Sequence, residues 1–125
     1  MLLEITEHAV GDVTVLDLNG RLVLTEAEEP LREHVEALIA HGRVKLVIDM
    51  TNVTYIDSAG LGMLVAKYVS ARRRGGDIRL CHLTPRSTHV IEITRLSCVF
   101  SVFDSEDEAV DSFDRDTRET GPGPR

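Results

Sequence analysis

Residues 44–69 read VKLVIDMTNVTYIDSAGLGMLVAKYV, and this stretch decides the fold. Its first part, residues 44–50, is almost entirely apolar, which is typical of a central strand covered on both faces. A loop is predicted from Thr51 to Asp57. After the loop, apolar residues recur at the spacing of one helix face: Leu61, Leu64, Val65, Tyr68 and Val69. The stretch therefore predicts a buried strand, a loop and a helix, in that order.

The sequence after this helix predicts the second strand of a βαβ unit and then three shorter elements. Gly75-Gly76 ends the helix, and residues 77–83 form the next strand. Thr84-Pro85 then opens a short helix, and residues 98–103 form a short strand. Residues 105–108 have the spacing of a capping box that opens a last helix.

The sequence before residue 44 predicts two strands, an extended run and a helix. Alternating apolar residues place antiparallel strands around residues 3–5 and 13–15, and residues 20–24 are extended. The helix that follows is predicted to begin near Pro30, because proline fits best in the first turn of a helix. It is predicted to end at Gly42.

The length and the charge of the chain limit the class of protein. The chain has 125 residues, of which 42% are hydrophobic, and a net charge of −7. This length allows one domain, which we place at residues 1–113, followed by a polar, disordered tail at residues 114–125. The acidic balance disfavours nucleic acid as a partner, since phosphates attract a surplus of cations. The apolar runs are too short to predict a membrane span, and the acidic start does not predict a secretory signal, so we expect a cytoplasmic location.

The cysteines and histidines do not indicate catalysis or metal binding. Cys81 and Cys98 lie among apolar residues and predict two reduced thiols in the core. The histidines lack the spacing of metal ligands on one helix, and Cys81 and His82, as neighbours on one strand, would point to opposite faces. The sequence contains no dinucleotide fingerprint, P-loop or nucleophile elbow. It therefore predicts no catalytic residue, no cofactor and no metal site.

The candidate functional residues lie where the predicted loop meets the helix, at Asp57-Ser58-Ala59-Gly60-Leu61-Gly62. In open α/β sheets, functional sites gather at the carboxyl ends of strands, although Asp57 or Ser58 would also be an ordinary N-cap. Gly60 and Gly62 each weaken the first helical turn by about 1 kcal/mol relative to alanine. Two such residues favour a site where something must approach the backbone closely, or where the local fold is tight.

The face of this helix opposite the apolar stripe is also unusual. It carries Ala59, Gly62, Met63 and Ala66, and no charged residue occurs between Asp57 and Lys67. A solvated helix face would carry charges, so this pattern favours a contact with another protein. We therefore predict a partner-binding segment made of Asp57, Ser58, Ala59, Gly60, Leu61, Gly62 and Met63.

The motif of residues 57–62, preceded by Ile48-Asp49 and Ile56, resembles the hallmark of the STAS domain family, which includes bacterial anti-sigma factor antagonists. The similarity runs over about residues 20–113. The resemblance implies an α/β fold in which a mixed β-sheet carries about four helices, packed mainly on one face. It also implies that an anti-sigma factor serine kinase binds the chain and phosphorylates Ser58, with a phosphatase as a further candidate partner.

Two positions depart from the family pattern. Val23 stands where many antagonists have an acidic residue near the phosphorylated serine, and Ala59 replaces a second serine found in some relatives. A phosphoserine brings roughly −1.5 to −2 charges, which a free helix N-terminus tolerates and a closed interface does not. The chain would then bind its partner with a bare serine and release it when phosphorylated.

Two alternatives remain open on the sequence alone. The chain could be a STAS scaffold or an accessory subunit of a sensory or lipid-transport complex, without serine phosphorylation. It could also be a nucleotide-binding module, which only the helix N-terminus suggests.

Overall fold

The computed structural model describes the backbone of residues 3–120 and the side chains of residues 3–23 and 30–114. The elements follow in the order β1 (Glu4–Val10), β2 (Val13–Leu22), α1 (Leu24–Ala40), β3 (Lys45–Ile56), α2 (Ser58–Arg73), β4 (Asp77–Cys81), α3 (Pro85–Ile93), a 3₁₀ turn (Leu96–Cys98), β5 (Val102–Phe103) and α4 (Glu106–Thr120).

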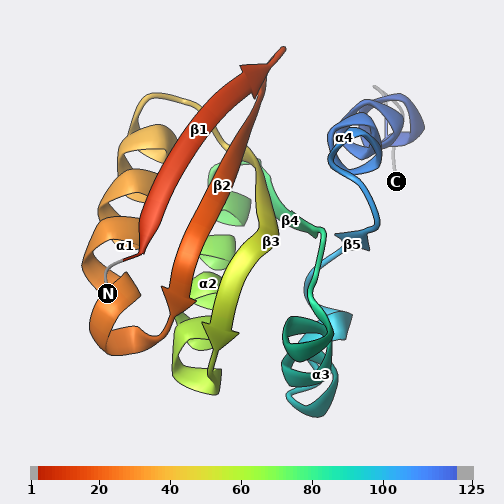
Figure 1. Ribbon diagram of the computed structural model, residues 1–125. Helices are drawn as coiled ribbons and strands as arrows, with labels where there is room; N and C mark the ends of the chain where they lie inside the picture. Colours follow the sequence, from red (N-terminus) through yellow and green to blue (C-terminus); the bar gives the residue numbers. More distant parts are fainter. Residues whose placement is uncertain (1–2, 121–125) are drawn as a thin grey trace.

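The strands form one sheet in the order β1-β2-β3-β4-β5, in which β1 and β2 are antiparallel and the other neighbours are parallel. Helices α1 and α2 lie together on one side of this sheet (Figure 1). Helix α4 is the exception, because it packs on the opposite face. The predicted α/β fold, a mixed sheet with four helices, is confirmed.

Side chains that alternate along the strands build a core on each face of the sheet. On the first face, Leu46 and Ile48 of β3 are fully buried in a cluster with Leu61 and Leu64 of α2. On the second face, Val47 packs in a smaller cluster with residues of β2, β4 and α4. Strand β3 is therefore covered on both faces, which explains the nearly continuous apolar run of residues 44–50 and confirms that prediction.

The prediction of a loop from Thr51 to Asp57 is wrong, because β3 continues to Ile56. Its second half pairs in parallel with the end of β2, where Tyr55 lies beside Arg21 and Ile56 beside Leu22. Of the separate extended run predicted at residues 20–24, residues 20–22 are accordingly part of β2, whereas Leu24 already begins α1. These residues gain their strand conformation from a partner distant in sequence, which a local hydrophobic pattern does not reveal.

Helix α1 also begins earlier than predicted, at Leu24 rather than near Pro30. Proline within a helix removes one backbone hydrogen bond. The buried residues Leu31, Val35 and Ile39 lie after the proline and anchor the helix against the sheet, so tertiary packing outweighs the local preference of proline for the first turn.

Three predictions after β4 need correction. Strand β4 ends at Cys81 and not at residue 83, because His82 adopts a positive φ of 57°. The strand predicted over residues 98–103 is reduced to Val102–Phe103. Cys98 lies in the preceding 3₁₀ turn and is exposed, whereas Cys81 is buried as expected.

Helix α4 continues to Thr120 and does not end at the predicted domain boundary at residue 113. The sequence contains no glycine or proline between Asp114 and Thr120 that would end a helix. Of the tail predicted at residues 114–125, residues 121–125 lie outside the described residues.

Phe113 and Arg79 attach α4 to the second face of the sheet. Phe113 is 4% exposed, and the guanidinium carbon of Arg79 lies 4.0 Å from the centre of its ring. Arg79 also donates hydrogen bonds to Asp77 on its own strand, at 2.9 Å, and to Ser112 on α4, at 2.6 Å. These contacts hold the middle of α4 over β3 and β4.

We expect Phe113→Ala to lower the free energy of unfolding by about 3–5 kcal/mol, because it removes a large buried side chain from this small core. Urea denaturation measures the change, when the free energy of unfolding falls with urea concentration at the same slope in the variant and the wild type. Ile93 is the matched control, since it is 65% exposed, and Ile93→Ala should change stability by less than about 0.5 kcal/mol. Similar effects of the two variants would show that α4 is not fixed through Phe113.

Candidate functional site

The predicted partner-binding segment lies at the junction of β3 and α2, at the carboxyl end of the parallel strands. Asp57 has an extended backbone and is the N-cap of α2, where its carboxylate accepts a hydrogen bond of 2.7 Å from the backbone N–H of Gly60. The backbone N–H of Asp57 donates to the carbonyl of Leu22 at 3.4 Å. The N-cap role of Asp57 and its contact with β2 fix where the helix starts and place Ser58 as its first residue.

The segment divides into an exposed and a buried part. Ser58, Ala59 and Gly62 are exposed, whereas Leu61 is fully buried and Met63 is 8% exposed. Ala66 and Val69 continue the exposed side along α2. We call this exposed strip the docking face, and it consists of Ser58, Ala59, Gly62, Ala66 and Val69. It carries no charged side chain, as the sequence predicted, but two predicted positions are corrected: Met63, which was expected on this face, is buried, and Val69, which was expected on the apolar stripe, is exposed.

The two glycines of the motif have different roles. A Cβ atom on Gly60 would stand 2.1 Å from the carbonyl oxygen of Leu22, far inside van der Waals contact. The same atom on Gly62 would meet nothing within 4 Å. At Gly60, the chain segment that approaches the backbone closely is therefore β2 of the same molecule, at the point where β2 meets α2. Only Gly62 presents bare backbone on the docking face.

Val23 lies beside this junction. It is 5% exposed, and its Cα would stand 3.2 Å from a Cβ on Gly60. This position, at which the family resemblance implies an acidic residue, therefore does neighbour the first turn of α2. In this chain it contributes an apolar contact and no charge.

Two arginines flank the junction on the surface. The guanidinium carbons of Arg21, on β2, and Arg86, on α3, lie 5.8 and 4.9 Å from the ring centre of Tyr55. Arginine and tyrosine are enriched where protein interfaces bind most strongly. Sequence analysis missed this group, because Arg21 and Tyr55 become neighbours only when residues 51–56 form a strand beside β2.

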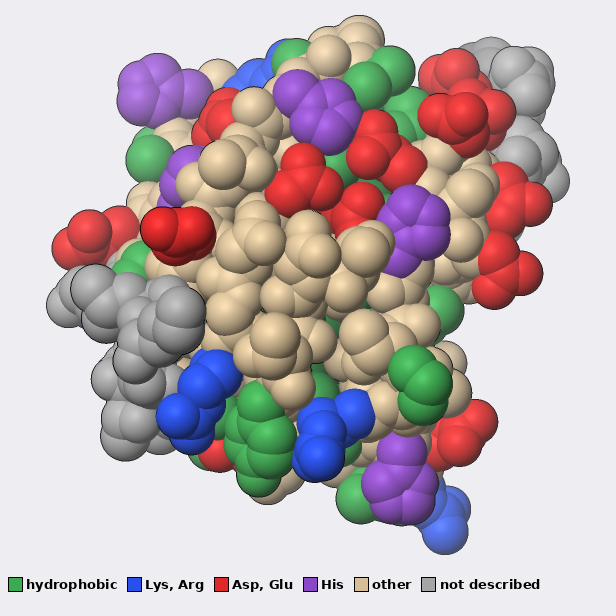
Figure 2. Space-filling view, in the orientation of Figure 1, with side chains coloured by type: hydrophobic (Ala, Val, Ile, Leu, Met, Phe, Trp, Pro, Cys, Tyr) green, Lys and Arg blue, Asp and Glu red, His purple; other side chains and the backbone are tan. Residues whose placement is uncertain are grey.

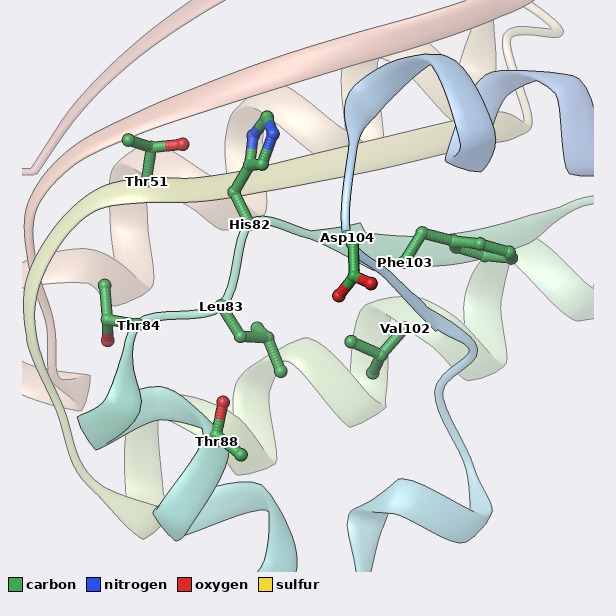
Figure 3. A pocket seen from close by; sticks show the side chains of 8 residues that line it. All are labelled: Thr51, His82, Leu83, Thr84, Thr88, Val102, Phe103 and Asp104. Atoms are coloured by element: carbon green, nitrogen blue, oxygen red, sulfur yellow. The ribbon is translucent and has the colours of Figure 1, made fainter.

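A cavity of about 550 Å³ opens between the end of β3, the loop after β4 and β5 (Figure 3). Its described lining is mostly threonine and apolar side chains, and its charged or titratable members are His82 and Asp104. No lysine or arginine is among these lining residues, so the cavity offers little attraction for the phosphates of a nucleotide. The nucleotide-binding alternative gains no support from this cavity.

Among the described residues, no hydrogen bond joins a histidine to the hydroxyl of Ser58. In the same part of the chain, residues 3–120, no helix is long and apolar enough to cross a membrane.

The match to a family model and the matches to known proteins indicate the same family. The STAS domain model matches residues 4–109. The anti-sigma-B factor antagonist of Listeria monocytogenes is 35% identical over 78 residues, which cover 62% of this chain and 68% of the relative. The anti-sigma F factor antagonist of Paenibacillus polymyxa is 24% identical over 104 residues, covering 83% and 88% of the two chains.

Solved structures share the fold. An anti-sigma factor antagonist from Mycobacterium paratuberculosis superposes with a TM-score of 0.78 at 24% identity, covering 88% of this chain and 92% of the other. The phosphorylated form of the Bacillus cell fate determinant SpoIIAA superposes with a TM-score of 0.69 at 20% identity, covering 88% and 99%. Part of the murine anion transporter Slc26a9 also matches, with a TM-score of 0.68 at 20% identity, over 82% of this chain and 18% of that one.

We expect Gly60→Ala and Gly62→Ala to affect stability in opposite directions. The first forces a Cβ into the backbone of Leu22 and should lower the free energy of unfolding by about 3 kcal/mol. The second meets open space and should raise it by about 0.5–1 kcal/mol, through the better helix propensity of alanine. Urea denaturation of both variants measures the difference, and equal effects would contradict the contact between Gly60 and β2.

Proposed function

Because the chain belongs to the STAS domain family, we propose that it is an anti-sigma factor antagonist, a binding protein and not an enzyme. It docks onto an anti-sigma factor serine kinase through the docking face of α2, and phosphorylation of Ser58 releases it. The observation that carries this proposal is the exposed hydroxyl of Ser58 at the first position of a helix whose outer face is uncharged. The names of the curated relatives support the same role.

The shape of the docking face supports close contact with a partner. Ala59, Gly62 and Ala66 are small, so the backbone of α2 is accessible over two turns. Apolar surface of this kind is removed from water when a partner covers it, which favours association. Tyr55 with its two arginines, at the end of β3, would lie at the rim of such an interface.

Phosphorylation of Ser58 would reverse this association. In the free protein, the backbone N–H groups at the start of α2 favour an anion. In the complex, a group with roughly −1.5 to −2 charges would have to lose its water beside the carboxylate of Asp57, on a face without a cation of its own. Since about 1.4 kcal/mol corresponds to tenfold in affinity, even part of this desolvation penalty would release the partner.

This switch requires two further conditions. A phosphatase must restore the bare serine, and the exchange must take place in the cytoplasm, where sigma factors act. Val23 leaves the neighbourhood of Ser58 without the acidic residue of many relatives, so recognition by the kinase would depend on the docking face itself.

A second candidate is a scaffold or accessory subunit that is not phosphorylated. The match to part of the transporter Slc26a9 supports it, because there a similar fold forms 18% of a much larger protein. Phosphorylation of Ser58 separates the two candidates.

We expect Ser58→Asp to weaken binding to the cognate kinase by at least about tenfold, and Ser58→Ala to leave it within about twofold. The aspartate brings a charge into the interface, whereas alanine only removes a hydroxyl. Calorimetry with purified serine kinases from the same cell measures both affinities. Ser101→Asp is the matched control, since Ser101 is an exposed serine in the segment before β5 and does not belong to the docking face. Unchanged binding by Ser58→Asp would contradict the proposed switch.

We also expect the wild-type chain, incubated with such a kinase and ATP, to gain one phosphate on the peptide that contains Ser58. Intact-mass and peptide mass spectrometry detect it. Ser58→Ala should gain none, because no second serine stands in the motif. A chain that binds the kinase tightly but stays unmodified would support the scaffold instead.

A further inference from the structure

Three side chains form a group at the carboxyl ends of β2 and β3, beside the docking face. The guanidinium carbons of Arg21 and Arg86 lie 5.8 and 4.9 Å from the ring centre of Tyr55. Arg21 is the strand neighbour of Tyr55, and Arg86 comes from the first turn of α3. We call these three residues the arginine–tyrosine group. Only two residues separate Tyr55 from Ser58, so the group borders the start of the docking face.

The group is open to solvent. Tyr55 is 38% exposed, and Arg21 and Arg86 are both exposed. Among the described residues, no ion pair joins Arg86 to an acidic side chain. Its contact with the ring of Tyr55 restrains the guanidinium but does not neutralise its charge. A positive charge at this position is therefore available to a partner.

The charge of the group is opposite to that of the neighbouring surface. The chain has 21 acidic and 14 basic residues, and three of the acids, Asp17, Asp49 and Glu106, lie together on the face of the sheet that α4 covers in part. Figure 2 shows acidic and histidine side chains in the upper middle of this face, and basic side chains near its lower edge, on either side of a hydrophobic one. At the lower edge, β2 and β3 end and α2 begins (Figure 1). The positive charge thus lies at the end of the molecule that carries Ser58.

The chemistry of the group suits a carboxylate. Guanidinium groups bind carboxylates through parallel hydrogen bonds, and arginine keeps its charge at any physiological pH. Two guanidinium groups beside one ring repel each other, and a carboxylate between them removes this repulsion. The ring of Tyr55 adds apolar surface against which the carbon atoms of an acidic side chain can pack. A segment rich in aspartate or glutamate fits these features.

We propose that the arginine–tyrosine group binds an acidic segment of the serine kinase, at the rim of the interface that the docking face forms. This inference rests on the proposed function, because it adds a second contact with the same partner. Charges at the rim of an interface act mainly on the rate of association and on its salt dependence, since they attract the partner before the surfaces meet. The group orients the kinase so that it closes on α2.

An acidic segment at this position also strengthens the effect of phosphorylation. In the complex it lies close to Ser58, so a phosphate on Ser58 faces the negative charge of the partner as well as the carboxylate of Asp57. Like charges brought together in an interface lower the affinity. The same contact therefore favours binding of the bare serine and opposes binding of the phosphoserine.

Surface plasmon resonance with the purified serine kinase that binds the wild-type chain measures the association and dissociation rates, at low and at high salt. We expect Arg21→Glu and Arg86→Glu each to slow association at low salt by at least about fivefold, and to change dissociation by less than about threefold. The association of both variants should depend less on salt than that of the wild type. Arg86→Lys keeps the charge and should associate within about twofold of the wild-type rate.

Arg74→Glu is the matched control. It changes the net charge of the chain by the same amount as Arg86→Glu, but at the other end of α2, where Arg74 is the C-cap. Its association rate should stay within about twofold of the wild-type rate. Thermal unfolding checks that the variants fold. A glutamate in the first turn of α3 interacts favourably with the helix dipole, so Arg86→Glu should not lower the transition temperature.

Two results would overturn this proposal and leave the proposed function intact. The first is that Arg21→Glu and Arg86→Glu associate at the wild-type rate. The second is that Arg74→Glu slows association as much as they do, because the net charge and not the arginine–tyrosine group would then be responsible. If none of the purified serine kinases of the same cell binds the wild-type chain, both this proposal and the proposed function are wrong.

Discussion

The parallel pairing of β2 with β3 is the contact on which the rest of the structure depends. It extends from Val13 beside Lys45 to Leu22 beside Ile56, beyond the point where β4 stops. At its end, the carbonyl of Leu22 receives the N–H of Asp57 and lies against Gly60. The start of α2 is therefore fixed by β2 and not by the helix alone. This contact keeps Ser58 on the surface while Leu61, three residues later, is fully buried.

Strand β3 contributes to both faces of the sheet. Its end leads into the docking face, and its middle places Asp49, which accepts hydrogen bonds from the backbone N–H and the hydroxyl of Thr51, on the other face. The first surface is uncharged and made of small side chains, whereas the second gathers acidic and histidine side chains around Asp49.

The features that the sequence predicts best are those that depend on residues close together in the chain. The strand predicted from the apolar run of residues 44–50 depends on near neighbours and is confirmed, and of the two N-cap candidates, Asp57 and Ser58, the structure has Asp57. The strand conformation of residues 51–56 depends on β2, and the burial of Gly60 depends on Leu22, so neither was predicted. The exposure of Cys98 was missed because apolar neighbours in sequence do not show on which side a 3₁₀ turn faces. The hydrogen bond between His82 and Asp49 was missed for the same kind of reason, since the two residues meet only through the fold of the sheet.

The absence of charge on the docking face explains why a single modified serine could control binding. A charge that finds no partner when an interface closes loses its water without compensation, which costs several kcal/mol. On α2, the exposed residues from Ser58 to Ala66 carry no charge, and Lys67 is turned away, 8% exposed and paired with Glu36 of α1 at 2.8 Å. A phosphate at Ser58 would then be the dominant charge of the covered surface. The arginines beside Tyr55 would lie at the rim of the interface, where solvent and salt screen their attraction to that phosphate.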